Sequence, residues 1–215
     1  MDETTLILDL DDTIFKTRSL DPKPFQAFFD RLQFNLRKET SQEKVDLVLE
    51  EIWQRPWDSV ITRHGLPMEP LLDAISVLET LKLDLTIAPY PDYVFLKNLN
   101  CPKFLVTTSL TSLQEIKIKA LNIEQDFEKI FINDTFKRKE TKLSIFKDLS
   151  ITYGLNPART FVIGDNASSE IAAGNALNFK TVQILREGVE KGVNANYYIH
   201  SFEELEQILN TEPSA

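Results

Sequence analysis

The sequence predicts an α/β protein in which a doubly wound parallel sheet, a Rossmann-like core, carries an inserted helical domain. Short and nearly continuous apolar runs alternate with amphipathic segments, which is the pattern of parallel strands covered by helices on both faces. One long stretch near the N-terminus departs from this alternation, since it holds helical patterns and no convincing strand. A chain of 215 residues is long enough for one core domain with such an insert.

Six segments are predicted to be strands. The first covers residues 4–10, where Leu6, Ile7 and Leu8 form an apolar run that leads to Asp9. Such a run suits a strand that is buried on both faces. The other segments have the same character, and the last of them is expected at an edge of the sheet: residues 103–107, 129–132, 160–163, 180–184 and 197–199.

Helices are predicted between these strands. Thr111 and Gln114 resemble a capping box, in which two side chains satisfy the free backbone N–H groups of a first helical turn. Residues 143–153 are amphipathic, and Gly154 stands where a helix C-terminus is expected. The remaining helical segments are residues 168–177 and 202–209.

The inserted helical stretch is expected to form a cap. Its helical patterns cover residues 25–36, 42–53, 57–64 and 68–81. We therefore predict a core made of residues 1–18 and 86–215, with residues 19–85 as an α-helical cap domain. Open α/β sheets bind ligands at the carboxyl ends of their strands, so the cap is expected to lie over that edge.

The composition limits the classes of partner. The formal net charge of -9 argues against a nucleic-acid polymer, because phosphate backbones are bound largely by Lys and Arg, whereas one local cation can hold a small phosphorylated metabolite. Cys101 is the single cysteine, so no intrachain disulfide can form and a cytoplasmic location is expected. No apolar run approaches the roughly 20 residues that span a bilayer, so no membrane contact is expected. The oligomeric state stays open.

Acidic residues gather where the first strand is expected to end. Asp9 and Asp11 are two residues apart, so an extended chain points them to one side while Leu10 points away. Asp12 and Thr13 follow directly. Carboxylates at the end of a buried strand need a cation or hydrogen bonds to offset their burial, although Asp and Thr are also common in solvated turns. The cluster is a candidate for chemistry.

A second buried strand ends in an acid as well. Gly164 and Asp165 follow the predicted strand 160–163, and Glu170 comes five residues after Asp165. The alternative interpretation is a turn that caps the next helix, because Asn and Ser also occur there. Two strands that each deliver an aspartate to the same edge favour a site for Mg²⁺, which prefers a few carboxylate oxygens as ligands.

Two further segments are candidates to hold a phosphate group. Thr107, Thr108 and Ser109 stand at a strand end that opens a helix, where hydroxyls and backbone N–H groups bind anions. The same residue types often only cap helices. The basic run of residues 137–142 offers a fixed cation beside the carboxylates, although most charge runs are solvated loops.

In their order along the chain, these four segments resemble the signature motifs of the haloacid dehalogenase superfamily. The matching residues are Asp9-Leu10-Asp11-Asp12-Thr13 for the first motif, Thr107 for the second, Lys142 or Lys139 for the third, and Gly164-Asp165 for the fourth. The helical insert is similar to the cap of one large subfamily, and the layout resembles phosphoglycolate-phosphatase-like and pyrimidine-nucleotidase-like members. Lys142 is preferred over Lys139 because it begins a predicted helix. Glu170 stands where many members have aspartate.

The resemblance implies a Mg²⁺-dependent phosphatase that acts on a small phosphate monoester. Asp9 would be the nucleophile that forms an aspartyl-phosphate, and Asp11 would serve as general acid and then as general base. Mg²⁺ would be held by Asp9, the backbone carbonyl of Asp11 and Asp165, with Glu170 in support. Its charge would offset the repulsion between a carboxylate nucleophile and a phosphate dianion.

The resemblance also implies a set of phosphate contacts. Thr107 and Lys142 would bind the phosphoryl oxygens with their side chains. Backbone N–H groups near Leu10 and Thr108 would bind them as well. Thr13 would orient the loop rather than react.

Other activities of the same superfamily stay open. Asp11 favours phosphate esters over haloacids, because displacing a halide needs no protonated leaving group. A phosphonatase would use an added lysine of the cap, and a phosphomutase would differ in cap geometry. A non-catalytic relative that binds phosphate or phosphoproteins would be expected to lack Asp9 or Asp11, and both are present.

The aromatic residues of the expected cap are interpreted as its core. The phenylalanines within residues 25–29 form one helix face, for which we favour packing over a platform for base stacking. Trp53 and Trp57 are interpreted in the same way. Arg55, which lies between them, is a candidate for contact with a substrate.

Overall fold

A single parallel sheet forms the core of the protein. The computed structural model describes residues 3–53, 55–137 and 140–211. Six strands pair in the order β3-β2-β1-β4-β5-β6, and every neighbouring pair is parallel. The strands are β1 (Thr5–Leu8), β2 (Lys103–Thr108), β3 (Lys129–Asn133), β4 (Thr160–Gly164), β5 (Lys180–Ile184) and β6 (Tyr197–Ile199). The doubly wound parallel sheet predicted from the sequence is therefore confirmed.

Strand β1 occupies the interior of this sheet. Leu6 pairs with Lys103 on β2 and with Phe161 on β4, although both partners are distant in the sequence. All residues of β1 are buried. Because successive side chains point to opposite faces, Ile7 packs into one apolar cluster while Leu6 and Leu8 pack into another.

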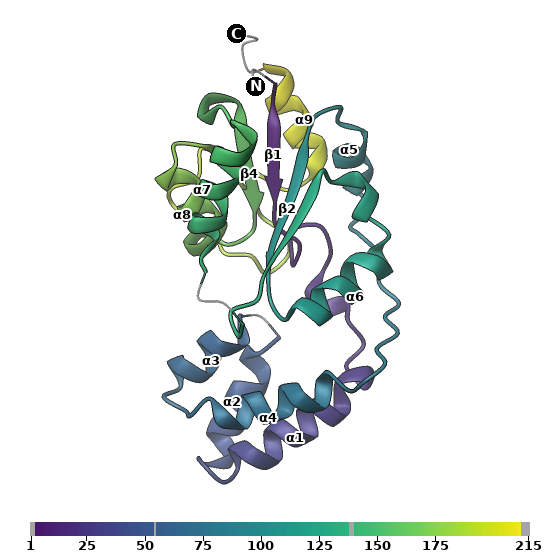
Figure 1. Ribbon diagram of the computed structural model, residues 1–215, viewed down its shortest axis with the longest axis vertical. Coiled ribbons are helices and arrows are strands. Elements are labelled where there is room, and N and C mark those ends of the chain that lie inside the picture. Colours follow the sequence, from purple (N-terminus) through teal and green to yellow (C-terminus); the bar gives the residue numbers. More distant parts are fainter. Residues whose placement is uncertain (1–2, 54, 138–139, 212–215) are drawn as a thin grey trace.

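Helices cover both faces of the sheet, as Figure 1 shows. One side carries α7 (Lys142–Tyr153) and α8 (Ala172–Ala176). The other side carries α5 (Tyr93–Asn98), α6 (Thr111–Leu121) and α9 (Phe202–Thr211). Gly154 ends α7 in the left-handed conformation, with a φ of 60°, as the sequence predicted. Within the described residues, no helix combines the length and the apolar character needed to cross a membrane.

Two helix starts differ from the prediction. The capping box at α6 is wrong, because Thr111 is already the first helical residue and no side chain of Leu110 caps the helix. Asp134, which follows β3, accepts hydrogen bonds from Thr111 N and Oγ1 at 3.0 and 2.9 Å and so provides a carboxylate at the helix N-terminus. The segment before α8 begins as a π-helix, Ala167–Ile171, a form that often marks functional sites.

In the part of the chain that the structure describes, the cap consists of four α-helices that come after β1 and before α5. They are α1 (Gln26–Leu36), α2 (Gln42–Glu51), α3 (Trp57–Arg63) and α4 (Glu69–Leu78). In Figure 1 they lie together beyond the carboxyl ends of β1 and β2. Buried apolar residues hold them to one another, including Phe28, Val48, Ile61 and Leu71. The division of the chain at residues 18 and 86 stays a prediction.

The two connections between core and cap run beside each other. Tyr90 N donates a hydrogen bond to Ile14 O at 2.8 Å. Arg186, which is buried, pairs with both oxygens of Asp92 at 2.8 and 3.1 Å and donates to Thr13 O at 3.1 Å. Its guanidinium lies 4.0 Å from the ring centroid of Tyr90. One buried cation thus joins both connections to the core.

Candidate active site

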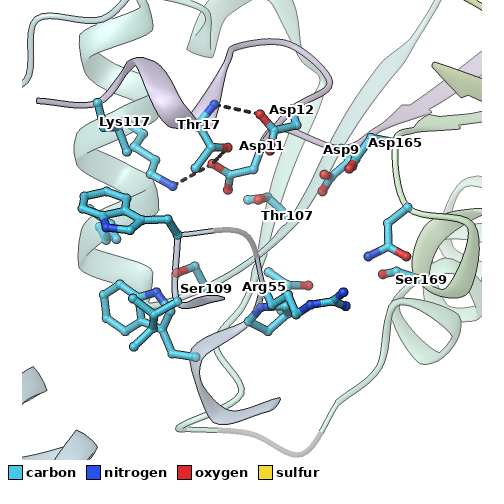
Figure 2. Close-up of a pocket in the computed structure, with 18 of the residues that line it drawn as sticks. Asp9, Asp11, Asp12, Thr17, Arg55, Thr107, Ser109, Lys117, Asp165 and Ser169 are labelled. Atoms are coloured by element: carbon cyan, nitrogen blue, oxygen red, sulfur yellow. Dashed lines mark hydrogen bonds and ion pairs between the residues drawn. The ribbon is translucent and has the colours of Figure 1, made fainter. Parts of the chain in front are cut away.

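Three neighbouring strands deliver the predicted residues to one edge of the sheet. Asp9 follows β1, Asp165 follows β4, and Thr107 lies near the end of β2. Because these strands are adjacent and parallel, their carboxyl ends meet. Figure 2 shows Asp9, Asp11, Thr107 and Asp165 around one pocket, so the structure brings together what the sequence predicted.

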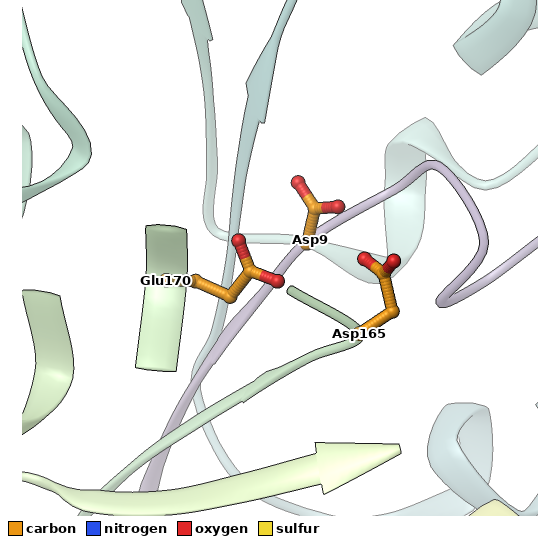
Figure 3. A group of neighbouring side chains, drawn as sticks. All are labelled: Asp9, Asp165 and Glu170. Carbon is orange, nitrogen blue, oxygen red and sulfur yellow. The ribbon is translucent and has the colours of Figure 1, made fainter. Parts of the chain in front are cut away.

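The acidic cluster contains three carboxylates. Asp9, Asp165 and Glu170 each offer one oxygen, and these oxygens lie within 4.8 Å of one another (Figure 3). Burial raises the pKa of Asp9 to about 7, against the opposing effect of the Lys142 ammonium. Burial also raises the pKa of Asp165 to about 9, and the charges of Glu170 and Asp9 add to this shift. The cluster therefore favours taking up positive charge, and its oxygen donors fit a small hard cation such as Mg²⁺.

Lys142 connects two of these carboxylates. Its Nζ lies 2.6 Å from Asp9 Oδ1 and 2.8 Å from Glu170 Oε2. Although burial alone would lower it, the pKa of Lys142 is held above its usual range by Asp9 and Glu170, so the side chain is a fixed cation. Thr141 caps the helix that Lys142 begins. The alternative candidate, Lys139, lies outside the described residues.

Glu170 is anchored on both of its oxygens. Oε1 accepts a hydrogen bond from Asn166 N at 2.6 Å, while Oε2 binds Lys142. The side chain also fills the space beside Gly164, where an added Cβ would lie 2.3 Å from Glu170 Cγ. Glycine at this position therefore lets Glu170 reach the cluster. Its support of a metal ion stays a prediction.

The carboxylate of Asp11 stands apart from the cluster and is held by α6. Lys117 Nζ lies 2.7 Å from Asp11 Oδ1, and Gln114 Nε2 donates to Asp11 Oδ2 at 2.8 Å. The same amide nitrogen donates to Thr107 Oγ1 at 2.7 Å. Gln114 is buried, and the Lys117 side chain is only 5% exposed. One amide therefore orients both the candidate acid and the candidate phosphate-binding hydroxyl.

The loop that follows β1 is a tight turn. Asp12 adopts a left-handed conformation, with a φ of 52°, and its carboxylate accepts a hydrogen bond from Thr17 N at 2.9 Å. Thr13 is buried, and among the described residues its Oγ1 has no hydrogen-bond partner. Its carbonyl binds Arg186, so Thr13 acts on the loop through its backbone. Leu10 O accepts hydrogen bonds from the N–H groups of three residues of this turn.

The backbone phosphate contacts predicted at Leu10 and Thr108 stay predictions. Leu10 comes directly after Asp9, and Thr108 ends β2 at the edge of the pocket. The backbone carbonyl of Asp11, predicted as a metal ligand, also stays a prediction. Only the carboxylate oxygens of the three clustered residues lie close enough together in the described part of the chain to suggest such a site.

The cap closes the pocket on the side opposite the sheet. Arg55 lines it, together with an apolar wall that includes the aromatic residues Phe25, Phe29, Trp53 and Trp57. These rings pack as part of the cap core, as the sequence predicted. They also face the pocket, so the interpretation as core alone is incomplete.

The sequence did not identify Gln114, Lys117 and Arg186 as site residues. A signal existed for the first two, because they interrupt the apolar stripe of an amphipathic helix, where a polar residue needs a buried partner. Their partner Asp11 is about a hundred positions away, and only the fold brings the two segments together. Arg186 follows β5 without any pattern that distinguishes it from a loop arginine.

The fold and the site together define a Rossmann-like α/β protein with a helical cap, with carboxylates and a buried lysine at the carboxyl edge of its parallel sheet. The chain belongs to the haloacid dehalogenase-like hydrolases, since the model of that family matches residues 6–184. No curated protein matches the sequence.

Solved structures with the same fold cover nearly the whole chain. The HAD-hydrolase YfnB from Bacillus subtilis, bound to magnesium, is 16% identical with a TM-score of 0.64, over 97% of this chain and 99% of that one. A HAD phosphatase from Thermococcus onnurineus is 22% identical with a TM-score of 0.61, over 97% and 99%. The L-2-haloacid dehalogenase RSc1362 is 14% identical with a TM-score of 0.60, over 98% and 100%. These likenesses show the fold, and they include both a phosphatase and a dehalogenase.

Proposed function

We propose that the protein is a Mg²⁺-dependent phosphatase that hydrolyses a small phosphate monoester through an aspartyl-phosphate. The observation that carries the proposal is the carboxylate of Asp11, which faces the same pocket as Asp9 and is held by two side chains of α6. Displacing a halide requires no proton donor, whereas an alcohol must be protonated as it leaves. A fixed carboxylate in the same pocket as the nucleophile therefore supports ester hydrolysis over dehalogenation.

Asp9 supplies the nucleophile. In the first step one of its oxygens attacks phosphorus, and the bond between phosphorus and the leaving oxygen breaks. Asp11 gives its proton to that oxygen, so an alcohol departs. In the second step Asp11 takes a proton from water, the water oxygen attacks phosphorus, and the bond to Asp9 breaks. Inorganic phosphate is released, and the enzyme returns to its starting state.

Asp9, Asp165 and the backbone carbonyl of Asp11 would hold Mg²⁺, with Glu170 in support. When bound, the ion offsets the repulsion between the nucleophile and a phosphate dianion and stabilises the charge in transfer. The raised pKa values of Asp9 and Asp165 support this assignment, because a divalent cation can take the place of the protons that burial favours.

The phosphoryl oxygens would be bound by Lys142, Thr107 and the N–H groups of Leu10 and Thr108. Lys142 is a fixed cation beside the nucleophile. The Thr107 hydroxyl accepts from Gln114, so its own proton is available to a phosphoryl oxygen. The formal net charge of -9 supports a small phosphorylated metabolite as substrate rather than a nucleic-acid polymer.

Phosphate release from p-nitrophenyl phosphate and a panel of phosphometabolites tests the proposal. We expect turnover with Mg²⁺ that disappears with EDTA and in Asp9→Asn. Asp148→Asn, an exposed aspartate on α7, is the matched control and should keep the activity. Chloride release from 2-chloropropionate that depends on Asp9, without phosphate release, would instead assign a dehalogenase. Well-folded protein that turns over neither class would point to a non-catalytic phosphate binder.

A further inference from the structure

The pocket has two walls of different chemistry. The wall on the sheet side holds the carboxylates, hydroxyls and lysines of the candidate active site. The wall on the cap side is apolar, and its described members include Leu20, Phe25, Phe29, Ile52, Trp53 and Trp57. A phosphate group bound at Asp9 would therefore place its alcohol against an apolar surface.

The described residues on the cap side offer few polar groups to the pocket. Among the described cap residues that line the pocket, Arg55 alone carries a charge or a hydroxyl. Hydroxyl groups buried without hydrogen-bond partners are costly, so a polyol such as a sugar would be poorly accommodated there. An apolar or aromatic group would lose no hydrogen bonds in the same position.

The aromatic rings of this wall are held in place by one another. Trp53 lies edge-on to Phe25, with ring centroids 5.9 Å apart, and 4.9 Å from the centroid of Phe29. Trp57 stacks on Phe28 at 4.7 Å, with an interplanar angle of 24°. Both indoles are only partly buried. Each indole is supported by neighbouring rings and keeps part of its surface uncovered, so it can pack against a planar group.

Arg55 has a different position in the pocket. Figure 2 shows its guanidinium extending toward the side where Ser169 lies. No hydrogen bond or ion pair joins it to another described residue, whereas Lys117 and Lys142 are both paired with carboxylates. Arg55 is thus the cation of the described pocket that can bind an anionic substrate group without breaking an ion pair.

We propose that the substrate is a phosphate monoester whose alcohol carries a planar aromatic or heteroaromatic ring, which packs against Trp53 and Trp57. The inference rests on the proposed function, because it assumes that the phosphate lies at Asp9. It narrows the substrate class, since it excludes ring-free sugar phosphates and phosphoglycolate as the preferred substrates.

Matched substrate pairs test the role of the ring. Adenosine and uridine 5′-monophosphate each share the reacting ribose and phosphate with ribose 5-phosphate, and benzyl phosphate is paired with ethyl phosphate. We expect kcat/KM to be higher by about tenfold or more for the ring-bearing member of at least one pair, within the range that stacking of a base on an aromatic side chain provides. Ring-free members that match or exceed their partners in all three pairs would overturn the inference.

Variants of the wall separate packing from general effects on the fold. Trp53→Leu should lower the ratio of kcat/KM between ring-bearing and ring-free substrates to a few-fold. Phe34→Leu is the control, because Phe34 is an aromatic residue on α1 that is 57% exposed and does not line the pocket. A ratio that falls equally in both variants, or in neither, would contradict the role of Trp53. Circular dichroism checks that both variants are folded.

Tryptophan fluorescence gives a readout without turnover. The chain has two tryptophans, Trp53 and Trp57, and both line the pocket. In Asp9→Asn, ring-bearing phosphates should quench the fluorescence with saturation, and ribose 5-phosphate should quench it far less. Asp9-dependent hydrolysis without ring preference would remove this inference and leave the proposed function. Saturable quenching without hydrolysis by the wild-type protein would overturn the proposed function, and with it the substrate assignment, and would leave a site that only binds ring-bearing phosphates.

Discussion

The ammonium of Lys117 lies 2.7 Å from Asp11 Oδ1, while the amide of Gln114 binds the other oxygen of the same carboxylate. The two residues are three positions apart on α6, so their side chains leave the same face of the helix. Asp11 is therefore positioned mainly by a neighbouring helix, with a longer hydrogen bond of 3.4 Å from Thr17 Oγ1 of its own loop. This relationship supports the assignment of Asp11 to proton transfer, because such a group must stay at a defined distance from the leaving oxygen.

Removal of Lys117 should affect leaving groups unequally. Lys117→Met removes the side chain that holds one oxygen of Asp11 in place. Alkyl phosphates need a correctly placed proton donor for the departing oxygen, so they should lose about 10- to 100-fold in kcat. p-Nitrophenyl phosphate, whose leaving group departs without a proton, should lose far less. Lys119→Met, an exposed lysine on the same helix, is the control. Equal losses for both substrates would assign Lys117 to the fold rather than to the positioning of Asp11.

The effect of Mg²⁺ on stability should depend on pH. The pKa values of Asp9 and Asp165 are raised to about 7 and about 9, above the unfolded value near 4. Between about pH 4 and pH 9 the native metal-free protein thus binds more protons than the unfolded chain, and its stability falls as pH rises. Mg²⁺ competes with these protons, so the shift in Tm that it causes should grow over the same range.

Thermal unfolding with and without Mg²⁺, across this pH range, checks that expectation. Asp165→Asn removes one titrating ligand and should flatten the pH dependence. A Tm shift that is the same at every pH would mean that Mg²⁺ binds elsewhere.

A methyl group at Gly164 should disturb Glu170. The Cβ of Gly164→Ala would lie 2.3 Å from Glu170 Cγ, so the glutamate must move away from the cluster. We expect a loss of about 1–3 kcal/mol in the free energy of unfolding, as is typical of overpacking, together with weaker Mg²⁺ binding. In the Glu170→Ala background the same substitution should cost much less. Urea unfolding of the four proteins of this double-mutant cycle measures the coupling, and additive effects would exclude the steric account.

Replacement of Arg186 should weaken the junction between core and cap. Arg186→Met leaves the largely buried Asp92 carboxylate without its cation and Thr13 O without a donor. We expect the free energy of unfolding to fall by about 3 kcal/mol, the scale seen when one partner of a buried ion pair is removed. Arg31→Met breaks an exposed Arg–Asp pair with Asp73 and should cost much less. Similar losses in the two variants would contradict the special role of the buried pair.

Substitution of Arg55 should change binding more than chemistry. Arg55→Gln removes the described cap cation that lines the pocket, so KM for phosphate monoesters should rise several-fold while kcat changes little. Arg37→Gln, at an exposed position after α1, is the control. A fall in kcat with unchanged KM would instead mean that Arg55 stabilises the transition state.

The site residues that the sequence could predict are mainly those that stand at the ends of strands. Asp9 and Asp165 each follow an apolar run, and the parallel sheet brings such strand ends together whatever the loops do. Lys142 could be predicted because a helix begins there. Gln114 was not predicted as a site residue, although it interrupts an apolar stripe, because its pattern with Thr111 is typical of a helix cap. In the structure Asp134, after β3, binds Thr111 instead.

Other features depend on packing that a sequence does not display. Helix α5 is six residues long, too short for a periodic pattern to indicate it. The aromatic residues of the cap have the composition of a core, and whether a ring also faces a pocket depends on how the cap meets the sheet. We therefore expect substrate selectivity to depend on how the cap packs over the sheet, which the motifs do not display.

The interior place of β1 also has a consequence for how the protein is made. Leu6 pairs with Lys103 and Phe161, so the strand that carries the nucleophile leaves the ribosome long before either neighbour. At the usual rate of synthesis, β4 follows roughly ten seconds or more after β1. During that interval the cap helices can fold while an apolar strand waits without partners. During synthesis the cap can therefore form before the sheet that it covers.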